Sequence, residues 1–191
     1  AFRFRAETSP SFLHKTGWLF FISCGANMGW IVAWHYEATV LSLLIMLTLL
    51  FSLAVLYQRL EIGQSTPYSA ERFMVHLPFS VYLGWITVAT IANVTAVLVH
   101  WGWGRFGLSE QFWAALMILI ATGLGFMMLF RRNDLVFVAV LAWAFYGIYS
   151  KRSADLTEAS QLVAMASKAA MIILIMGWIY QMIRKRNFGI K

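Results

Sequence analysis

The sequence has few charged residues, one cysteine and three prolines, and each shortage excludes a class of structure. Charged residues make up 12% of the chain, whereas a soluble domain carries about 25%. The lone Cys24 excludes an internal disulfide, and its place in an apolar run indicates a packing role. No proline interrupts a long apolar run, and no run alternates as a strand would, so helices are expected.

The sequence also lacks the residue patterns of the common catalytic and metal sites. We find no Ser/His/Asp set, no paired carboxylates within an apolar run, no Cys–His partner and no phosphate loop. No two of the four histidines have a metal-binding spacing. We therefore expect a protein that is not an enzyme and has no metal site. The net charge of +7 comes from basic residues at the ends of apolar runs, so nucleic acid is not an expected partner.

Apolar residues make up 61% of the chain, which also contains nine Trp and ten Met. The stretch from Leu77 to Trp103 contains no Lys, Arg, Asp or Glu. A helix of about 25 residues is roughly 37 Å long, enough to cross the hydrocarbon core of a bilayer. The composition predicts an integral, multi-pass membrane protein whose main partner is the lipid bilayer, in a bacterial inner membrane or an organellar membrane.

Apolar runs and the charges that end them predict one all-α domain, a polytopic bundle of six transmembrane helices. The predicted spans lie at about residues 17–35, 39–57, 77–101, 112–130, 135–149 and 163–183. Pro78 suits the first turn of the third span, and Ser109 is a plausible N-cap of the fourth. Asn133 or Asp134, in a tight polar hairpin, is predicted to cap the fifth.

The distribution of basic residues predicts the orientation of the bundle. Eleven of the fifteen Lys and Arg residues fall on the side that holds both ends of the chain. Both termini are therefore predicted to lie on the positive, cytoplasmic side. Because residue 1 is Ala rather than Met, we expect that a leader was removed or that the chain is part of a longer protein.

One face of the third span carries polar and aromatic side chains. Tyr82, Trp85, Ala89 and Asn93 follow one another at spacings of three, four and four residues, so they lie along one side of a helix. An amide or a phenol that faced lipid without a partner would cost several kcal/mol. We expect this face to point into the protein.

A second face of this kind occurs in the first span, where Asn27 and Trp30 are followed one turn later by Trp34. Together the two faces would form an apolar pocket with a few hydrogen-bonding groups, the usual form of a site for a flat, hydrophobic ligand. The alternative is that the two amides bond across helices and only hold the bundle together. The residues alone favour neither interpretation.

Three ionisable residues near or within the spans are further candidates. His35 and His100 lie at span ends, where histidine usually occupies the interface, and either is a candidate ligand for a haem or chlorophyll of an adjacent chain. Lys168 falls within the last span, where a charge is a functional candidate by default. The interpretation that we favour is that its ammonium group extends to the membrane surface.

At these faces the sequence resembles the tryptophan-rich sensory protein family, the group of TspO and the translocator protein or peripheral benzodiazepine receptor. That family carries the patterns N-x-x-W and Y-L-x-W-x-x-x-A-x-x-x-N. They read here as Asn27-Met28-Gly29-Trp30 and as YLGWITVATIAN from Tyr82 to Asn93. On this alignment the first three spans resemble the last three of a five-helix member, and the long bacterial members look most similar.

The resemblance has limits. The first two helices of the family are missing from this chain, and residues after about Ser109 have no counterpart in the short members. Pro78 stands four residues before Tyr82, whereas in short members the proline directly precedes the tyrosine. The resemblance therefore covers roughly half of the chain.

The resemblance implies a non-enzymatic protein that binds, transports or senses a hydrophobic small molecule. The expected ligand is a tetrapyrrole (haem, porphyrin or chlorophyll) or a sterol-like lipid, held by the two faces described above. One alternative is an accessory structural or pigment-contacting subunit that binds other membrane subunits of an electron-transfer or photosynthetic complex. A third hypothesis is a small transporter or channel that uses Lys168.

Overall fold

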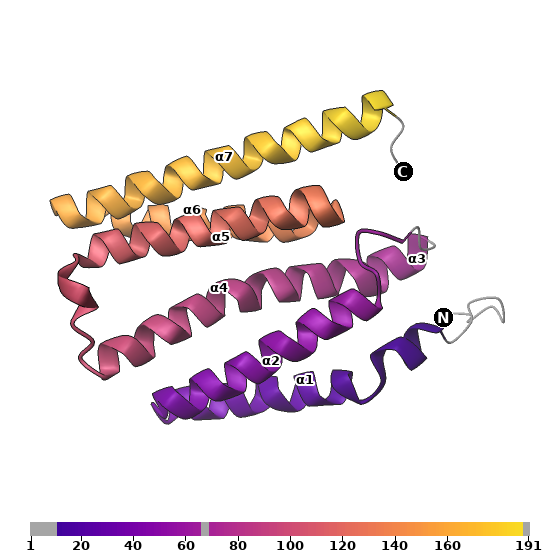
Figure 1. Ribbon diagram of the computed structural model, residues 1–191, viewed down its shortest axis with the longest axis horizontal. Coiled ribbons are helices and arrows are strands. Elements are labelled where there is room, and N and C mark those ends of the chain that lie inside the picture. The colour runs from indigo at the N-terminus through magenta and orange to yellow at the C-terminus, as the bar shows by residue number, and fades with distance from the viewer. Residues whose placement is uncertain (1–10, 66–68, 189–191) are drawn as a thin grey trace.

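The computed structural model describes residues 11–65 and 69–188, and all regular structure in these residues is helical (Figure 1). The helices are α1 (Ser11–His35), α2 (Thr39–Arg59), α3 (Ser69–Glu71), the π-helical turn η1 (Arg72–His76), α4 (Leu77–His100), the 3-10 turn η2 (Arg105–Gly107), α5 (Glu110–Arg132), α6 (Leu135–Ser153) and α7 (Glu158–Phe188). Among the described residues, six helices are long and apolar enough to cross a membrane. The prediction of an all-α bundle with six spans is confirmed.

The last two spans are longer than the apolar runs suggested. Helix α6 continues to Ser153 through Lys151 and Arg152, because basic residues are favourable at the carboxyl end of a helix. Helix α7 begins at Glu158, before the first strongly apolar turn, because an acidic residue stabilises the amino end. Polar turns at helix ends extend a helix beyond the part that lies in lipid.

The predicted caps are present. The Ser109 hydroxyl accepts a hydrogen bond from the backbone N–H of Phe112 at 3.2 Å, at the start of α5. Asn133 ends α5 in a left-handed conformation with φ of 53°, and Asp134 caps α6. The hairpin between α5 and α6 thus joins the two helices with only these two residues outside helix.

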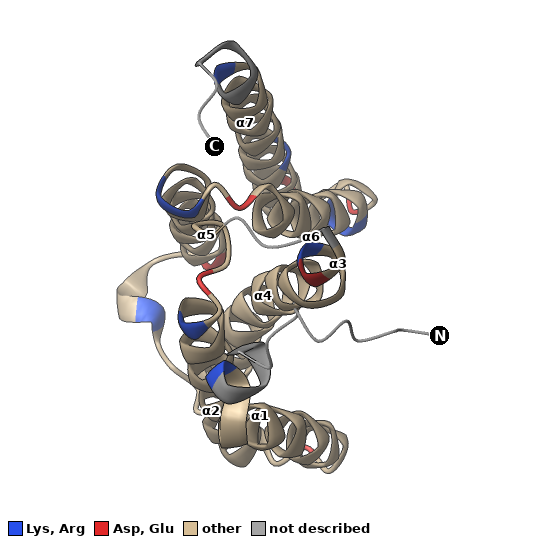
Figure 2. Cartoon of the chain, turned by 90° about the vertical axis from the view of Figure 1, so that its right-hand side faces the viewer, with Lys and Arg blue, Asp and Glu red and all other residues tan. Residues whose placement is uncertain are grey.

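The six spans form two groups of three. Helices α1, α2 and α4 make up the N-terminal half, and α5, α6 and α7 make up the C-terminal half (Figures 1 and 2). The halves meet mainly where α4 packs against α6. Gly84 allows this close approach, because a Cβ atom at this position would lie 3.1 Å from Cβ of Val140.

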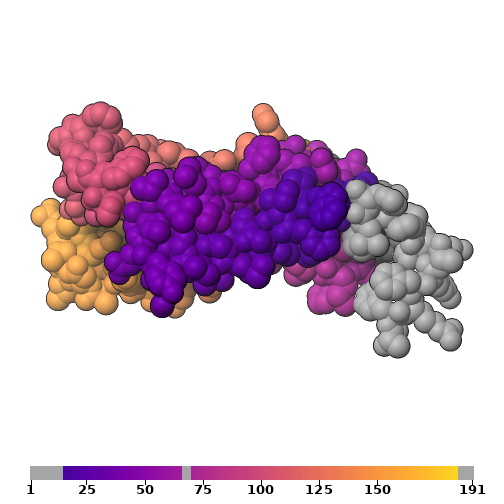
Figure 3. Space-filling model, turned by 90° about the horizontal axis from the view of Figure 1, so that it is seen from below, coloured from indigo at the N-terminus to yellow at the C-terminus, as the bar shows by residue number. Residues whose placement is uncertain are grey.

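The outward-facing side chains are mostly large and apolar, as a surface in contact with lipid requires. Phe51 on α2 is 69% exposed, whereas Leu49 and Leu53 on the same helix are buried in the core. The space-filling view shows α1 and α2 along one face of the molecule (Figure 3). Apolar side chains thus cover the outside of the bundle as well as fill its core, so the bundle is suited to a bilayer rather than to water.

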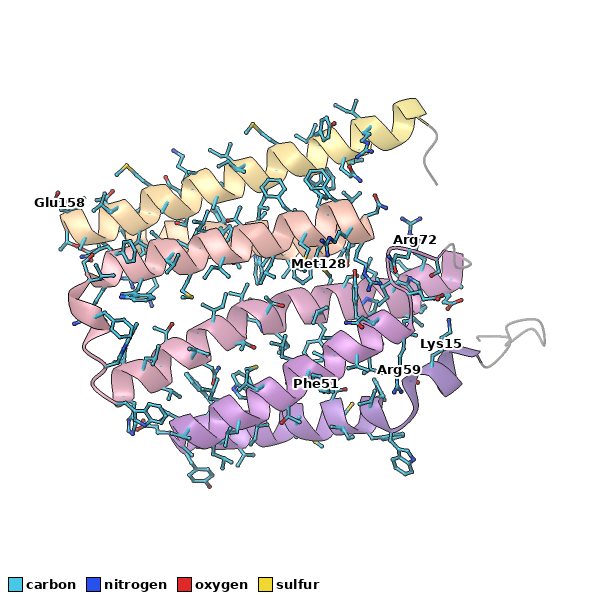
Figure 4. All side chains as sticks on the ribbon, viewed as in Figure 1. Lys15, Phe51, Arg59, Arg72, Met128 and Glu158 are labelled. Carbon is cyan, nitrogen blue, oxygen red and sulfur yellow. The ribbon has the colours of Figure 1, made fainter. Side chains whose placement is uncertain are left out.

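Basic residues gather at one end of the bundle. Lys15, Arg59 and Arg72 lie at this end, and Glu158 lies at the other (Figure 4). Helix α5 also ends at the basic end (Figure 1), and its last turn contains Arg131 and Arg132. We call this the basic end; its location on the cytoplasmic side of a membrane stays a prediction.

Candidate functional site

A groove of about 360 Å³ lies between α1, α2 and α4, and we call it the α1 groove. Its lining includes Phe20, Ser23, Asn27, Leu53, Phe79 and Tyr82. Helix α1 supplies most of the polar side chains and α4 supplies two aromatic rings. The groove therefore combines apolar walls with a few hydrogen-bonding groups. Of the seven residues predicted for the ligand site, Asn27 and Tyr82 line this groove and the other five do not.

Asn27 and Tyr82 both line the α1 groove, and each is half-buried. Within the part of the chain that the structure describes, neither side chain forms a hydrogen bond to protein. Helix α1 is kinked at Gly17, where φ is 48° and ψ is −146°. Asn27 lies ten residues after this kink, or about 15 Å along the continuous helix, which is near the centre of a bilayer. An amide at that depth costs several kcal/mol unless it finds a partner. The α1 groove thus contains two polar groups that a bound molecule would satisfy.

Asn93 has a different environment, although the sequence grouped it with Tyr82. Its side chain is only 3% exposed. Its carbonyl oxygen accepts hydrogen bonds from Nε1 of Trp30 at 3.3 Å and from the hydroxyl of Ser42 at 2.8 Å. Its NH2 group donates to the backbone oxygen of Ala89 at 3.2 Å. The Asn93 amide therefore joins α1, α2 and α4, as the alternative of a cross-helix bond predicted. Among the described residues, the amide of Asn27, in the α1 groove, forms no such bond.

The tryptophans of the predicted site lie in two places. Trp30 stacks on Trp34 with ring centroids 6.1 Å apart, beside the Asn93 hydrogen bonds. Trp85 is 45% exposed and contacts Trp143 of α6, with ring centroids 5.5 Å apart. The expectation that Trp85 points to the same interior face is wrong, because eight helical residues place it about 80° around α4 from Asn93.

The remaining predicted residues lie on the outside of the bundle. His35 and His100 are exposed at the last turns of α1 and α4. Lys168 is exposed on α7, and its ammonium nitrogen lies 5.5 Å from the ring centroid of Tyr149. Helical side chains lean toward the amino end of their helix, which for α7 is the nearer membrane surface. Lys168 does not line the α1 groove.

Asp134, near the basic end, was predicted only as a helix cap, but its carboxylate also bonds to other helices. Asp134 is 5% exposed. One carboxylate oxygen accepts the backbone N–H groups of Val136 and Phe137, each at 3.0 Å. The other accepts the hydroxyls of Tyr57 and Ser80, each at 2.7 Å. Asp134 therefore connects the α5–α6 hairpin to α2 and α4; its place directly after Arg-Arg-Asn was the available sequence signal.

A second groove, of about 530 Å³, lies beside this carboxylate between α2, α4 and α5, and we call it the α5 groove. Apolar side chains line its inner part, and Gln58, Arg131 and Arg132 lie at its outer end. The sequence predicts only a role in membrane orientation for these arginines. Their common groove depends on the relative position of α5 and α2 in the bundle, which no local pattern reveals.

Among the described residues, no group of three or more His, Cys, Asp or Glu side chains is placed to hold a metal ion. The polar groups that line the two grooves are amides, hydroxyls, a thiol and guanidinium groups. These groups bind by hydrogen bonding and charge. The arrangement of both grooves suits the binding of a hydrophobic or amphiphilic molecule.

Residues 1–180 match the family model described as TSPO-like protein. The match extends well past Ser109, so the similarity covers nearly the whole chain and not only the first three spans. No curated protein and no solved structure matches the chain significantly.

Proposed function

The chain belongs to the TSPO-like protein family, and from this premise we propose that it binds a flat hydrophobic ligand in the α1 groove. The proposed ligand is a tetrapyrrole or a sterol-like lipid, and the proposed role is its transport or sensing without catalysis. Family membership supports a membrane protein of TspO type; the ligand and the site are our proposal.

The observation that carries the proposal is the pair of unbonded polar groups, Asn27 and Tyr82, on one apolar groove. Lipid chains offer no hydrogen-bonding atoms, so these groups lack compensation when the groove holds only acyl chains. A ligand with a carboxylate, a ring nitrogen or a hydroxyl would satisfy them. Each such hydrogen bond contributes about 0.5–1.5 kcal/mol, and more when the ligand group is charged.

The walls of the groove favour a flat molecule. Phe20 of α1 and Phe79 of α4 approach with ring centroids 6.4 Å apart, and the phenol ring of Tyr82 lies on the same groove. Aromatic rings bind flat apolar faces by stacking and dispersion. A volume of about 360 Å³ is at the low end for ligand pockets. The groove would therefore hold one part of a large ligand and leave the rest against lipid.

Quenching of tryptophan fluorescence by protoporphyrin tests the proposal on the purified full chain in detergent. Trp30 lies one helical turn from Asn27, so bound porphyrin should quench it with a saturable dependence on concentration. Removing both polar groups, in the variant Asn27→Leu/Tyr82→Phe, should weaken binding about tenfold or more, from two lost hydrogen bonds. A sterol that shares the site should compete with the porphyrin.

Trp85→Phe is the matched control, because Trp85 lies with Trp143 outside the α1 groove. This variant should lose part of the total emission and keep the dissociation constant. A quenching curve that rises linearly without saturation, or an unchanged dissociation constant in Asn27→Leu/Tyr82→Phe, would argue against the proposed site.

A further inference from the structure

The α5 groove is a separate feature, on the side of the molecule where α5 lies beside α2. Helix α5 packs chiefly on α6 and α7, and the two halves of the bundle meet mainly through α4 and α6. This leaves a space between α2 and α5 that the protein does not fill, with a volume of about 530 Å³. Met128 of α5 lies at its border (Figure 4).

The lining of the α5 groove changes from apolar to basic along the helix axes. Its inner part is formed by Leu50, Ala54, Leu124 and Met127, and its outer end by polar and basic residues. On α2 the lining runs from Leu50 to Gln58, a distance of about 12 Å along the axis. Half of the hydrocarbon core is about 15 Å thick. The groove therefore covers most of the depth of one leaflet and ends in positive charge at the interface.

Arg132 at the outer end is held in place. Its Nη1 donates a hydrogen bond to the side-chain oxygen of Gln64 at 2.7 Å, and its guanidinium carbon lies 5.7 Å from the ring centroid of Tyr57. Gly63 fixes the loop that carries Gln64, because its φ is +79° and a Cβ atom there would lie 1.8 Å from the backbone oxygen of Arg132. The guanidinium is thus oriented before any ligand binds.

The positive charge at this end of the groove has no neutralising partner in the described part of the chain. Arg131 is exposed, and no carboxylate of the described residues lies within 4.0 Å of either arginine. Two guanidinium groups that line one groove and hold no carboxylate suit a phosphate, which accepts guanidinium N–H groups in pairs. Arg59, also at the basic end, is exposed and lines neither the α1 groove nor the α5 groove, so orientation alone explains that residue.

We propose that the α5 groove binds one anionic phospholipid of the leaflet at the basic end. Its phosphate would lie between Arg131 and Arg132, and one acyl chain would lie along Leu50 and Met127 between the two halves of the bundle. Charge complementarity selects the headgroup, and the apolar depth of the groove selects a lipid over a water-soluble phosphate. This inference does not rest on the ligand proposed for the α1 groove.

Native mass spectrometry of the delipidated full chain tests this proposal, with phosphatidylglycerol and phosphatidylcholine of identical acyl chains as the probes. Both lipids contain a phosphate, but only the first has a net negative charge. The wild-type chain should retain one phosphatidylglycerol at least tenfold more tightly than phosphatidylcholine. Glycerol phosphate, which has the headgroup chemistry without acyl chains, should not compete at equal concentration.

One double variant and one control test the role of the two arginines. Arg131→Gln/Arg132→Gln should reduce the preference for phosphatidylglycerol about tenfold or more. Arg59→Gln, which removes a charge at the same end outside the groove, should change it by less than about twofold, the size expected of a screened surface charge. Circular dichroism and the porphyrin titration show whether each variant keeps its helices and its α1 groove.

Met127→Trp fills the apolar part of the groove from its exposed side without changing charge. It should lower the affinity for phosphatidylglycerol several-fold while both arginines stay in place. The proposal is overturned if the wild-type chain binds the two lipids equally, if Arg59→Gln acts as strongly as the double variant, or if Met127→Trp leaves the affinity unchanged.

Discussion

Replacement of Asp134 should destabilise the bundle more than replacement of any exposed Asp or Glu does. Asp134 is buried and accepts hydrogen bonds from two hydroxyls and two backbone N–H groups. In Asp134→Ala the hydroxyls of Tyr57 and Ser80 lose their acceptor, and the first turn of α6 loses its cap. The two hydroxyls then remain buried without an acceptor.

The magnitude follows from these bonds. Loss of an N-cap costs about 1 kcal/mol, and each buried hydroxyl left without a partner costs about 1–3 kcal/mol. Removal of the buried carboxylate also relieves its desolvation, which offsets part of this cost. We expect Asp134→Ala to lower the free energy of unfolding by about 3 kcal/mol. Asp134→Asn keeps an acceptor for the cap and should cost about half as much.

The measurement is the free energy of unfolding in mixed micelles, titrated with a denaturing detergent and followed by circular dichroism. A double-mutant cycle between Asp134→Asn and Tyr57→Phe should give a coupling of about 1.5–3 kcal/mol, as for a hydrogen bond to a charged group. The assignment of Asp134 as a hydrogen-bonded link between the halves would be refuted by either of two results. One is a loss of unfolding free energy below about 1 kcal/mol in Asp134→Ala, and the other is additive effects of the two substitutions in the cycle.

Asp155 supplies the matched control, because its carboxylate also accepts a backbone N–H, that of Thr157 at 3.0 Å, but is exposed. This hydrogen bond holds the pKa of Asp155 below its usual value. The stabilisation it gives is present above the unfolded-state pKa of about 3.9 and is lost as the pH falls through the lower folded-state pKa. Asp155→Ala should therefore have a small effect at pH 7 that disappears in strong acid.

Other predictions concern the loop, the orientation, the last span and the assembly. Gly63→Ala should lower the free energy of unfolding by at least about 2 kcal/mol, because a positive φ is unfavourable for alanine and its Cβ would overlap Arg132; an unchanged unfolding curve would contradict the loop geometry. In a Cys24→Ser background, an impermeant maleimide should label Gln64→Cys and Thr157→Cys from opposite sides of the membrane, and labelling of both from one side would contradict six spans. Lys168→Met should change the free energy of unfolding by less than about 1 kcal/mol, the size of an exposed cation–π contact, and a larger loss would contradict an ammonium at the membrane surface. Native electrophoresis after gentle extraction should show a small free oligomer; migration within a large complex would favour the accessory-subunit hypothesis.

The sequence predicts what depends on local pattern. Apolar runs place all six spans, and the residues Ser109 and Asp134 cap the helices that they precede, because capping needs only a side-chain oxygen and the next turn of backbone. The resemblance to the TspO group rests on motifs within single helices, and the family match confirms it. These features require no knowledge of which helices are neighbours.

The sequence could not distinguish the two amides of the predicted site. Asn27 and Asn93 both lie at bilayer depth in apolar helices, but only Asn93 meets Ser42 and Trp30 across a helix contact. Trp85 was assigned to the interior face by its spacing, and an angular difference of about 80° was enough to bring it to the surface. Partners from other helices decide these outcomes, and one sequence does not specify which helices pack together.

The division into two halves has a consequence for biosynthesis. Contacts within α1, α2 and α4 join spans that leave the ribosome early, so this group can associate while α5 to α7 are still being made. The hydrogen bonds of Tyr57 and Ser80 to Asp134, however, cannot form early. Asp134 is synthesised 77 residues after Tyr57 and 54 residues after Ser80. Until that residue emerges, the nascent chain carries two hydroxyls without their native acceptor. Final closure of the bundle is therefore coupled to insertion of the second half.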